Sequence, residues 1–263
     1  MRYNEVMVEE SSKTILEWSY LPKSFFETTC KLNIADGSVV IDDGLVRGEF
    51  KGSNYDLGSD FRDAVHDTLA LVFQAQQVQS HQEFTLSSPA MLREYPEGRR
   101  DITVFAELFR LELSMGRGDF LLKDASGDVT QDTKAERLAK QDALRSDILY
   151  LSPTDLPIKR MLQSFQNALA DKDNLFIHLY EVRESLISEF GGHGPAKSAV
   201  GVSSSDWAKF GRLSNNEPVL EGRHRGNHDN LRSATDEEKK WALCFAQDLI
   251  QSYVTFCVKS QNP

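Results

Sequence analysis

Hydrophobic and polar positions follow a two-residue period in the first part of the chain. Residues 25–34 end in partial alternation, and the β-branched run 39–41 lies between the Asp-Gly turns at 36–37 and 43–44. Residues 45–50 form a third run of the same kind. An Asp-Gly pair between such runs is typical of a β-hairpin. The pattern therefore predicts a small sheet in the N-terminal part.

The period changes to that of a helix between residues 60 and 79, with Ser59 or Asp60 as the N-cap. Two more strands are predicted at 83–86 and 102–108. The polar stretch between them, 94–100, is expected to form a turn. The first half of the chain thus combines strands with one main helix.

The second half has helical periodicity almost throughout. Apolar residues recur three and four positions apart in 158–169 and in 175–190. Gly191–Pro195 is expected to end the second of these helices. A shorter helix is predicted at 206–213. These segments indicate an all-α C-terminal part.

The last helix has the clearest start signal. Thr235 at the N-cap and Glu238 at the third helical position fit a capping box. An apolar stripe then follows, formed by Trp241, Phe245, Leu249, Tyr253 and Phe256. We therefore expect a long helix at the C-terminal end.

The chain has 263 residues, which suits two domains better than one core. The polar segment 124–134 contains the residues of turns and linkers, and the charged stretch 135–146 favours a helix. We predict an α+β domain of unknown role at 1–130 and a helical domain at 150–263. Residues 131–149 would be a connecting helix or linker. The fold class is α+β, a mixed β-sheet domain followed by helices.

The net charge of -10 argues against non-specific binding to nucleic acid. The charge is unevenly distributed, however. Residues 1–150 contain 17 Lys+Arg against 26 Asp+Glu, whereas 151–263 contain 13 against 14. A polyanionic partner would therefore meet the C-terminal half more easily.

Three cysteines without a CxxC pair favour a reducing compartment, and Cys244 and Cys257 are predicted to pack in a helical core. The N-terminal residues lack the apolar core of a signal peptide. No run of about 18 apolar residues suggests a membrane span. We expect a cytoplasmic protein with no membrane partner.

Segment 218–232 is the densest cluster of candidate chemistry, with three arginines and two of the six histidines. Arginine presents a planar, permanently charged fork to phosphate oxygens. Histidine can transfer a proton near neutral pH. Cleavage of RNA by transesterification needs both roles, at the 2′-hydroxyl or 5′-oxygen and at the charged phosphorane. It requires no metal ion and no other cofactor.

Within that segment, Arg223 is followed after four intervening residues by His228, and His224 directly follows the arginine. This spacing resembles the R-x(4–6)-H motif of HEPN domains, in which the residue after the arginine is usually polar. The order of the surrounding features also agrees. It comprises a long helix with 179–182, the glycines 191–192, the segment 213–215 and a long final helix. Over roughly 155–259 the chain resembles bacterial HEPN proteins, including the ApeA-like and MauJ-like groups.

The resemblance implies a helical bundle that forms a homodimer, with two motifs meeting across the interface. Many members of the family are metal-independent ribonucleases of toxin–antitoxin or phage-defence systems. By this resemblance His228 would be the acid or base, Arg223 the phosphate ligand and His224 its polar partner. Further contacts with RNA are expected from Arg225, Asn227 and Arg232.

Other interpretations of the segment stay open. It can be a solvated loop, since charge runs usually lie at the surface. His224 and His228 are also spaced for two metal ligands, with Asp229 or His193 as a third. The alternative function is a non-catalytic dimerisation or sensor protein, whose N-terminal domain would bind an unknown ligand or protein. A third is an accessory protein encoded beside an enzyme operon.

Overall fold

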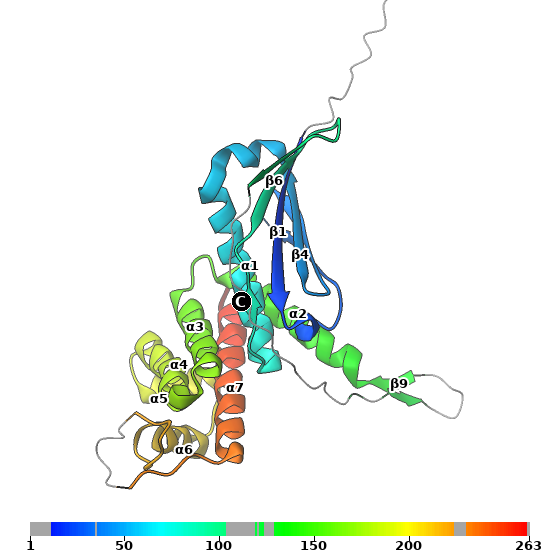
Figure 1. Cartoon of the computed structure of the whole chain (residues 1–263). Coiled ribbons are helices and arrows are strands. Elements are labelled where there is room, and N and C mark those ends of the chain that lie inside the picture. The colour runs from blue at the N-terminus through cyan, green and yellow to red at the C-terminus, as the bar shows by residue number, and fades with distance from the viewer. Residues whose placement is uncertain are drawn as a thin grey trace, which may run out of the picture. The chain divides into compact units, whose positions relative to one another are not determined.

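Strands dominate the N-terminal part of the chain and helices the C-terminal part (Figure 1), which confirms the predicted α+β class. The computed structural model describes residues 12–34, 36–103, 119, 121–123, 129–223 and 230–261. Two compact units can be distinguished. Unit 1 comprises Met1–Ala70 and Phe84–Gly116, and unit 2 comprises Leu71–Glu83 and Arg117–Pro263.

The sheet of unit 1 has the order β2-β3-β4-β1-β6-β7, with β5 also paired to β1, and all of these pairs are antiparallel. Its strands are β1 (Lys13–Leu21), β2 (Cys30–Ile34), β3 (Gly37–Asp42), β4 (Leu45–Lys51), β5 (Thr85–Leu86), β6 (Ala90–Glu94) and β7 (Arg100–Thr103). The predicted turn between β6 and β7 is closed by a hydrogen bond from the N–H of Tyr95 to the carbonyl of Arg99. Strands β1 and β6 were not predicted, and residues 104–108 of the predicted strand 102–108 lie outside the described residues.

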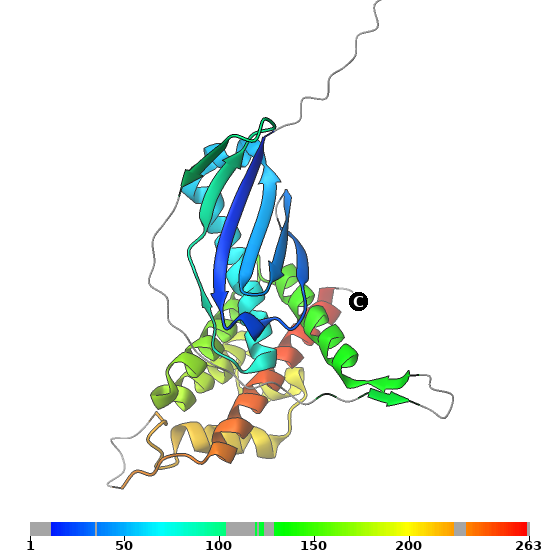
Figure 2. The ribbon, with the colours of Figure 1, turned by 45° about the vertical axis from the view of Figure 1, so that its right-hand side comes forward.

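One face of this sheet packs against the first part of helix α1 (Gly58–Ser80), as Figure 2 shows. The indole of Trp18 on β1 donates to Nδ1 of His66 at 3.1 Å. The rings of Phe50 and Phe61 meet edge to face at 5.1 Å. Alternate residues of β1 and β4 are buried on this side, so the period-two pattern produces the core of unit 1.

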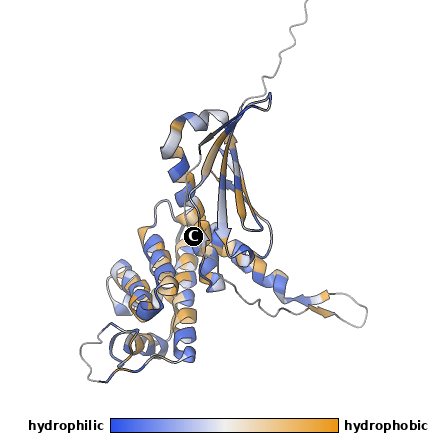
Figure 3. Cartoon of the chain, in the orientation of Figure 1, coloured by the Kyte–Doolittle hydropathy of each residue, from blue (hydrophilic) through white to orange (hydrophobic). Residues whose placement is uncertain are grey.

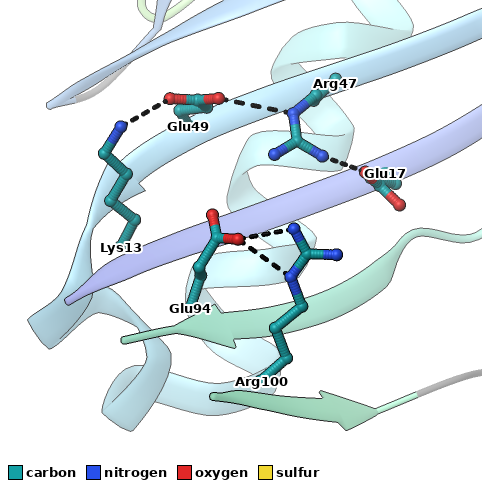
Figure 4. A network of polar contacts seen from close by, with 6 residues as sticks. All are labelled: Lys13, Glu17, Arg47, Glu49, Glu94 and Arg100. Carbon is teal, nitrogen blue, oxygen red and sulfur yellow. Dashed lines mark hydrogen bonds and ion pairs between the residues drawn. The ribbon is translucent and has the colours of Figure 1, made fainter. Parts of the chain in front are cut away.

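The opposite face of the sheet carries a network of ion pairs on β1, β4, β6 and β7 (Figure 4). The pairs join Glu49 to Lys13 and Arg47, Arg47 to Glu17, and Glu94 to Arg100. Exposed pairs of this kind contribute at most about 1 kcal/mol each. Ile15, 1% exposed on β1, lies between Glu49 and Leu92 of the neighbouring strands.

Unit 2 is built around α4, which contacts α3, α5, α6 and α7. Its described elements, besides the end of α1, are β8 (Leu121–Lys123), β9 (Val129–Asp132), α2 (Thr133–Leu151), α3 (Leu156–Ala170), α4 (Leu175–Phe190), α5 (His193–Val200), α6 (Ser204–Asn215) and α7 (Asp236–Gln261). These helices bear hydrophobic and hydrophilic residues on different faces (Figure 3). The hydrophobic faces form one core.

Local capping fixes where several of these helices begin. The side chain of Ser203 accepts the N–H of Asp206 at the start of α6. Thr235 and Glu238 bond reciprocally before α7, at 3.2 Å and 2.8 Å, which confirms the predicted capping box. The helix over 175–190 ends at Gly191, whose φ of 71° suits glycine. A new helix, α5, starts two residues later, which the sequence pattern did not predict.

Residues 131–149, predicted to connect two domains, form the end of β9 and most of α2. Leu144 and Ile148 of α2 are buried in the core of unit 2. That core also includes Ala75 and Val78 from the last turns of α1. The end of α1 and the whole of α2 thus belong to unit 2, whereas residues 124–128 of the predicted linker lie outside the described residues.

The cysteines of α7 differ from each other. Cys244 is exposed, so its predicted core position is wrong, whereas Cys257 packs against the core. Burial, together with the charge of Asp155, raises the pKa of the Cys257 thiol to about 11. The Sγ atom of Cys257 lies 3.6 Å from Oδ2 of Asp155. At neutral pH this thiol is therefore protonated and unreactive.

A thiol-specific reagent at pH 8 is expected to modify Cys244 at least about tenfold faster than Cys257, because only the thiolate is nucleophilic. The time course of modification by a chromogenic disulfide can be compared between the wild type and Cys244→Ser. The fast phase should disappear in this variant, and the slow modification of Cys257 should accelerate as the pH approaches 11. A fast phase that persists in Cys244→Ser would contradict this prediction.

Candidate functional site

Arg223 is the last described residue before 224–229 within segment 218–232, and its backbone is held by a hydrogen bond. Its N–H donates to the carbonyl of Ser214 on α6 at 3.0 Å. The strand-like stretches on either side of 224–229 pair with each other, since the N–H of Leu220 bonds Arg232 and the N–H of Arg232 bonds Pro218, both at 2.9 Å. Residues 218–223 and Arg232, on either side of 224–229, are thus held by backbone hydrogen bonds, and we call them the base of the segment.

Glu221 is the buried charge at this base, only 6% exposed. Its carboxylate accepts the N–H of Ala234 at 3.0 Å and pairs with Lys239 of α7 at 2.8 Å. Burial alone would raise the pKa of Glu221, but the hydrogen bonds from Lys239 and the backbone outweigh it and lower the pKa. The carbonyl of Glu221 also accepts the N–H of Phe176 on α4. Glu221 therefore connects the base of the segment to α7 through its carboxylate and to α4 through its carbonyl.

The guanidinium of Arg223 lies over the ring of Tyr180 on α4, 4.6 Å from its centroid. A second guanidinium, that of Arg183, lies 5.2 Å from the same centroid. The two charges are thus separated by no more than the sum of these distances. Among the described residues, no carboxylate forms an ion pair with either arginine. Two unpaired cations sharing one ring favour the binding of an anion.

Tyr180 is itself buried, and its pKa is raised by burial and by the charge of Glu184, while the two arginines act in the opposite direction. Glu184 is exposed on the next turn of α4. It is the acidic neighbour of the site and offsets part of the positive charge. Because its carboxylate is solvated, that effect is screened.

Arg183 is 7% exposed, and its burial lowers its pKa. Its guanidinium lies 4.8 Å from the ring of Trp207 on α6, and Nη1 donates to the carbonyl of that residue at 3.5 Å. Gly211, one turn further along α6, makes room for it, since an added Cβ would collide with Nη1. Helices α4, α5 and α6, which lie side by side in Figure 1, all contribute to its surroundings.

His193 is the first residue of α5 and is exposed. Its Nδ1 accepts a hydrogen bond from Nη2 of Arg183 at 3.2 Å and another from the indole of Trp207 at 3.3 Å. Arginine and the indole nitrogen can only donate. Nδ1 is therefore the acceptor, and in the neutral ring the hydrogen is on Nε2.

Of the six residues predicted to act on RNA, the structure describes Arg223 and Arg232. Arg232 is engaged elsewhere, because both of its Nη atoms bond the carboxylate of Glu238 at 2.7 Å. This geometry indicates that Arg232 stabilises the first turn of α7 through its ion pair with Glu238. The remaining four, His224, Arg225, Asn227 and His228, lie outside the described residues.

The metal interpretation also involves residues 224–229 and so lies mainly outside the described residues. Within the described part of the chain, no three His, Cys, Asp or Glu side chains are grouped to hold a metal ion. His178, on α4, bonds Asp171 at 3.2 Å. Glu181 of the same helix accepts from Ser164 at 3.2 Å. Both side chains thus have local partners on the α3–α4 side.

Comparison of the chain with protein families, curated proteins and solved structures finds no match. In the described parts of the chain, no helix is long and apolar enough to cross a membrane. The functional argument therefore depends on the residues of the site.

The sequence did not point to Tyr180, Arg183 or Trp207 as parts of a site. Tyr180 and Arg183 are three residues apart, which places them on one helical face. That spacing was the available signal, but an aromatic residue and an arginine on a helix are common. Trp207 lies in the predicted helix 206–213, and nothing in that pattern marked it as part of a site. His193 was considered only as a metal ligand or as part of a glycine-rich helix end.

Proposed function

We propose that unit 2 binds RNA and cleaves it without a metal ion, as a HEPN-type endoribonuclease. The observation that carries the proposal is the pair of guanidinium groups, Arg223 and Arg183, over the ring of Tyr180. They have no carboxylate partner among the described residues. They lie where the segment with His224 and His228 begins. Cations beside a titratable group are what phosphodiester chemistry requires.

In the proposed reaction the 2′-oxygen attacks the adjacent phosphorus and forms the new P–O2′ bond, while the P–O5′ bond breaks. A base removes the 2′-hydroxyl proton, and an acid supplies a proton to the departing 5′-oxygen. His228 performs one of these transfers and Arg223 stabilises the charged phosphorane. The products are a 2′,3′-cyclic phosphate and a 5′-hydroxyl.

The remaining roles belong to the same proposal. Arg225, Asn227 and His224 contact the RNA next to the reacting phosphate. The protein acts as a homodimer through unit 2, in the cytoplasm, within a phage-defence or toxin system. Unit 1 controls the site through a ligand or protein of its own. The RNA contacts, the homodimer and the defence or toxin role come from the HEPN resemblance, whereas the cytoplasmic location comes from the composition, and the resemblance does not cover unit 1.

The test is incubation of the full chain with total cellular RNA in the presence of a chelator. The wild type is expected to produce fragments that end in 2′,3′-cyclic phosphate. His228→Ala and Arg223→Ala are each expected to cleave at least about tenfold more slowly, since a proton-transfer group and a charge stabiliser are lost. Fragments are quantified on gels, and their ends are identified by phosphatase sensitivity.

Matched controls are His178→Ala and Arg100→Ala, which remove a histidine and an arginine that already have partners elsewhere. Both should cleave as the wild type does. Equal cleavage by all five proteins would reject the catalytic role of the motif. Binding of RNA without any cleavage would indicate an RNA-binding protein of this type. Neither binding nor cleavage would favour the alternative, a non-catalytic dimerisation or sensor protein.

A further inference from the structure

Arg183 is a buried cation with incomplete partners. Its Nε atom forms no hydrogen bond, and the attraction of the exposed Glu184 does not outweigh the burial, which lowers the pKa of Arg183. Burying an unpaired charge costs free energy, so such a group needs a compensating role. Its two Nη atoms reach the carbonyl of Trp207 and Nδ1 of His193. The guanidinium therefore holds a histidine that lies at the surface.

The hydrogen bonds of His193 leave one nitrogen for a ligand. Two donors converge on Nδ1, one from Arg183 and one from Trp207. The imidazole of His193 and the indole of Trp207 meet at 87°, with ring centroids 6.2 Å apart, and this contact fixes the plane of the imidazole. In the described part of the chain, Nε2 of His193 forms no hydrogen bond. An exposed N–H whose direction is fixed in this way is a donor suited to an anion.

We infer that Nε2 of His193 donates a hydrogen bond to a phosphate oxygen of the bound RNA, and that Arg183 positions this histidine. The inference rests on the proposed function, because it adds a binding residue to the same site. His193 is connected to Arg223 through Arg183 and Tyr180, so the exposed N–H and the cation of Arg223 belong to one network of contacts. Arg183 acts through His193 and through the shared ring, without contacting RNA itself.

Three substitutions of His193 separate a ligand from a structural role. Glutamine places an amide N–H near the position of Nε2, and asparagine places a carbonyl near that of Nδ1. Alanine provides neither group. A phosphate ligand predicts that glutamine restores binding and asparagine does not. A histidine that only satisfies Arg183 and Trp207 predicts the reverse.

The full chain and each variant are titrated with pyrophosphate by calorimetry and with a fluorescein-labelled single-stranded RNA by anisotropy. His193→Ala and His193→Asn are expected to bind both probes about tenfold more weakly, the loss for one hydrogen bond to a charged group. His193→Gln should bind within about threefold of the wild type. Gly211→Ala displaces the guanidinium of Arg183 and so removes the group that orients His193, while the imidazole itself is retained, and it should weaken binding in the same direction.

The outcomes distinguish this inference from the proposed function. The inference is overturned if His193→Asn binds as the wild type does while His193→Gln binds weakly. It is also overturned if all His193 variants bind with unchanged affinity. Neither result contradicts RNA cleavage. Binding of pyrophosphate in a His193-dependent manner, without any RNA binding, supports the anion site and overturns the proposed function. Absence of binding to either probe by the wild type overturns both.

Discussion

Replacing Phe210 by alanine is expected to lower the free energy of unfolding of unit 2 by about 3–5 kcal/mol. Phe210 on α6 is 0% exposed, and its ring lies 5.1 Å from that of Phe245 and 6.3 Å from that of Trp241 on α7. The rings of Trp241 and Phe245 stack on each other at an angle of 9°, so they cannot easily fill the vacated space. A cavity therefore remains. Urea denaturation followed by far-ultraviolet circular dichroism measures the loss.

The matched control is Tyr150→Ala on α2, where the aromatic side chain is 64% exposed. Its stability should change by less than about 0.5 kcal/mol. A loss below about 1 kcal/mol for Phe210→Ala would show that α6 is not held to α7 by this ring. Because Trp207 lies one turn earlier on α6, the same variant also tests whether the surroundings of Arg183 depend on that packing.

Helix positions in unit 2 followed closely from the sequence, because their signals are local. Ser203 caps α6 through a bond to Asp206, and Thr235 and Glu238 cap α7 through reciprocal bonds. In each cap the two residues are three positions apart. The apolar stripes of α3 and α4 then bury the residues whose spacing marked them. Neither signal depends on distant parts of the chain.

Strand β1 was missed for a physical reason. Ile15 and Leu16 are adjacent and both buried, one on each face of the sheet, so the expected alternation of apolar and polar residues is hidden. Its partners β4 and β6 are also distant in sequence. The register that buries both residues exists only after these strands have paired.

The site was predictable only in part. Arg223 was singled out from a short motif, which did not predict the position of its guanidinium over Tyr180, and its functional role stays a prediction. Arg183, His193 and Trp207 come from three helices, and no local pattern announces that they meet. An arginine on a helix is usually solvated, so its burial could not be foreseen. The role of His228 stays a prediction, because it lies outside the described residues.

The second large loss of stability is expected when Glu221 is replaced by alanine, at about 2–4 kcal/mol. The change leaves the N–H of Ala234 without its acceptor and Lys239 without its counterion. Both groups are partly or wholly buried, so water replaces the lost bonds only incompletely. Glu221→Gln keeps the shape and removes the charge, and it should lose less. Thermal and urea denaturation measure both variants.

The stability that depends on the charge of Glu221 must vary with pH. Its pKa in the folded protein lies below the ordinary value of 4.5, so the fold favours the carboxylate. The contribution is therefore complete above pH 4.5 and is lost as the pH falls through the lower folded value. The stability difference between the wild type and Glu221→Gln should shrink in that window, whereas a difference that is constant from pH 7 to pH 3 would contradict the role of the carboxylate. Glu217→Gln, at an exposed glutamate 3.9 Å from Arg232, is the control and should change stability by less than about 1 kcal/mol at any pH, because solvated pairs contribute little.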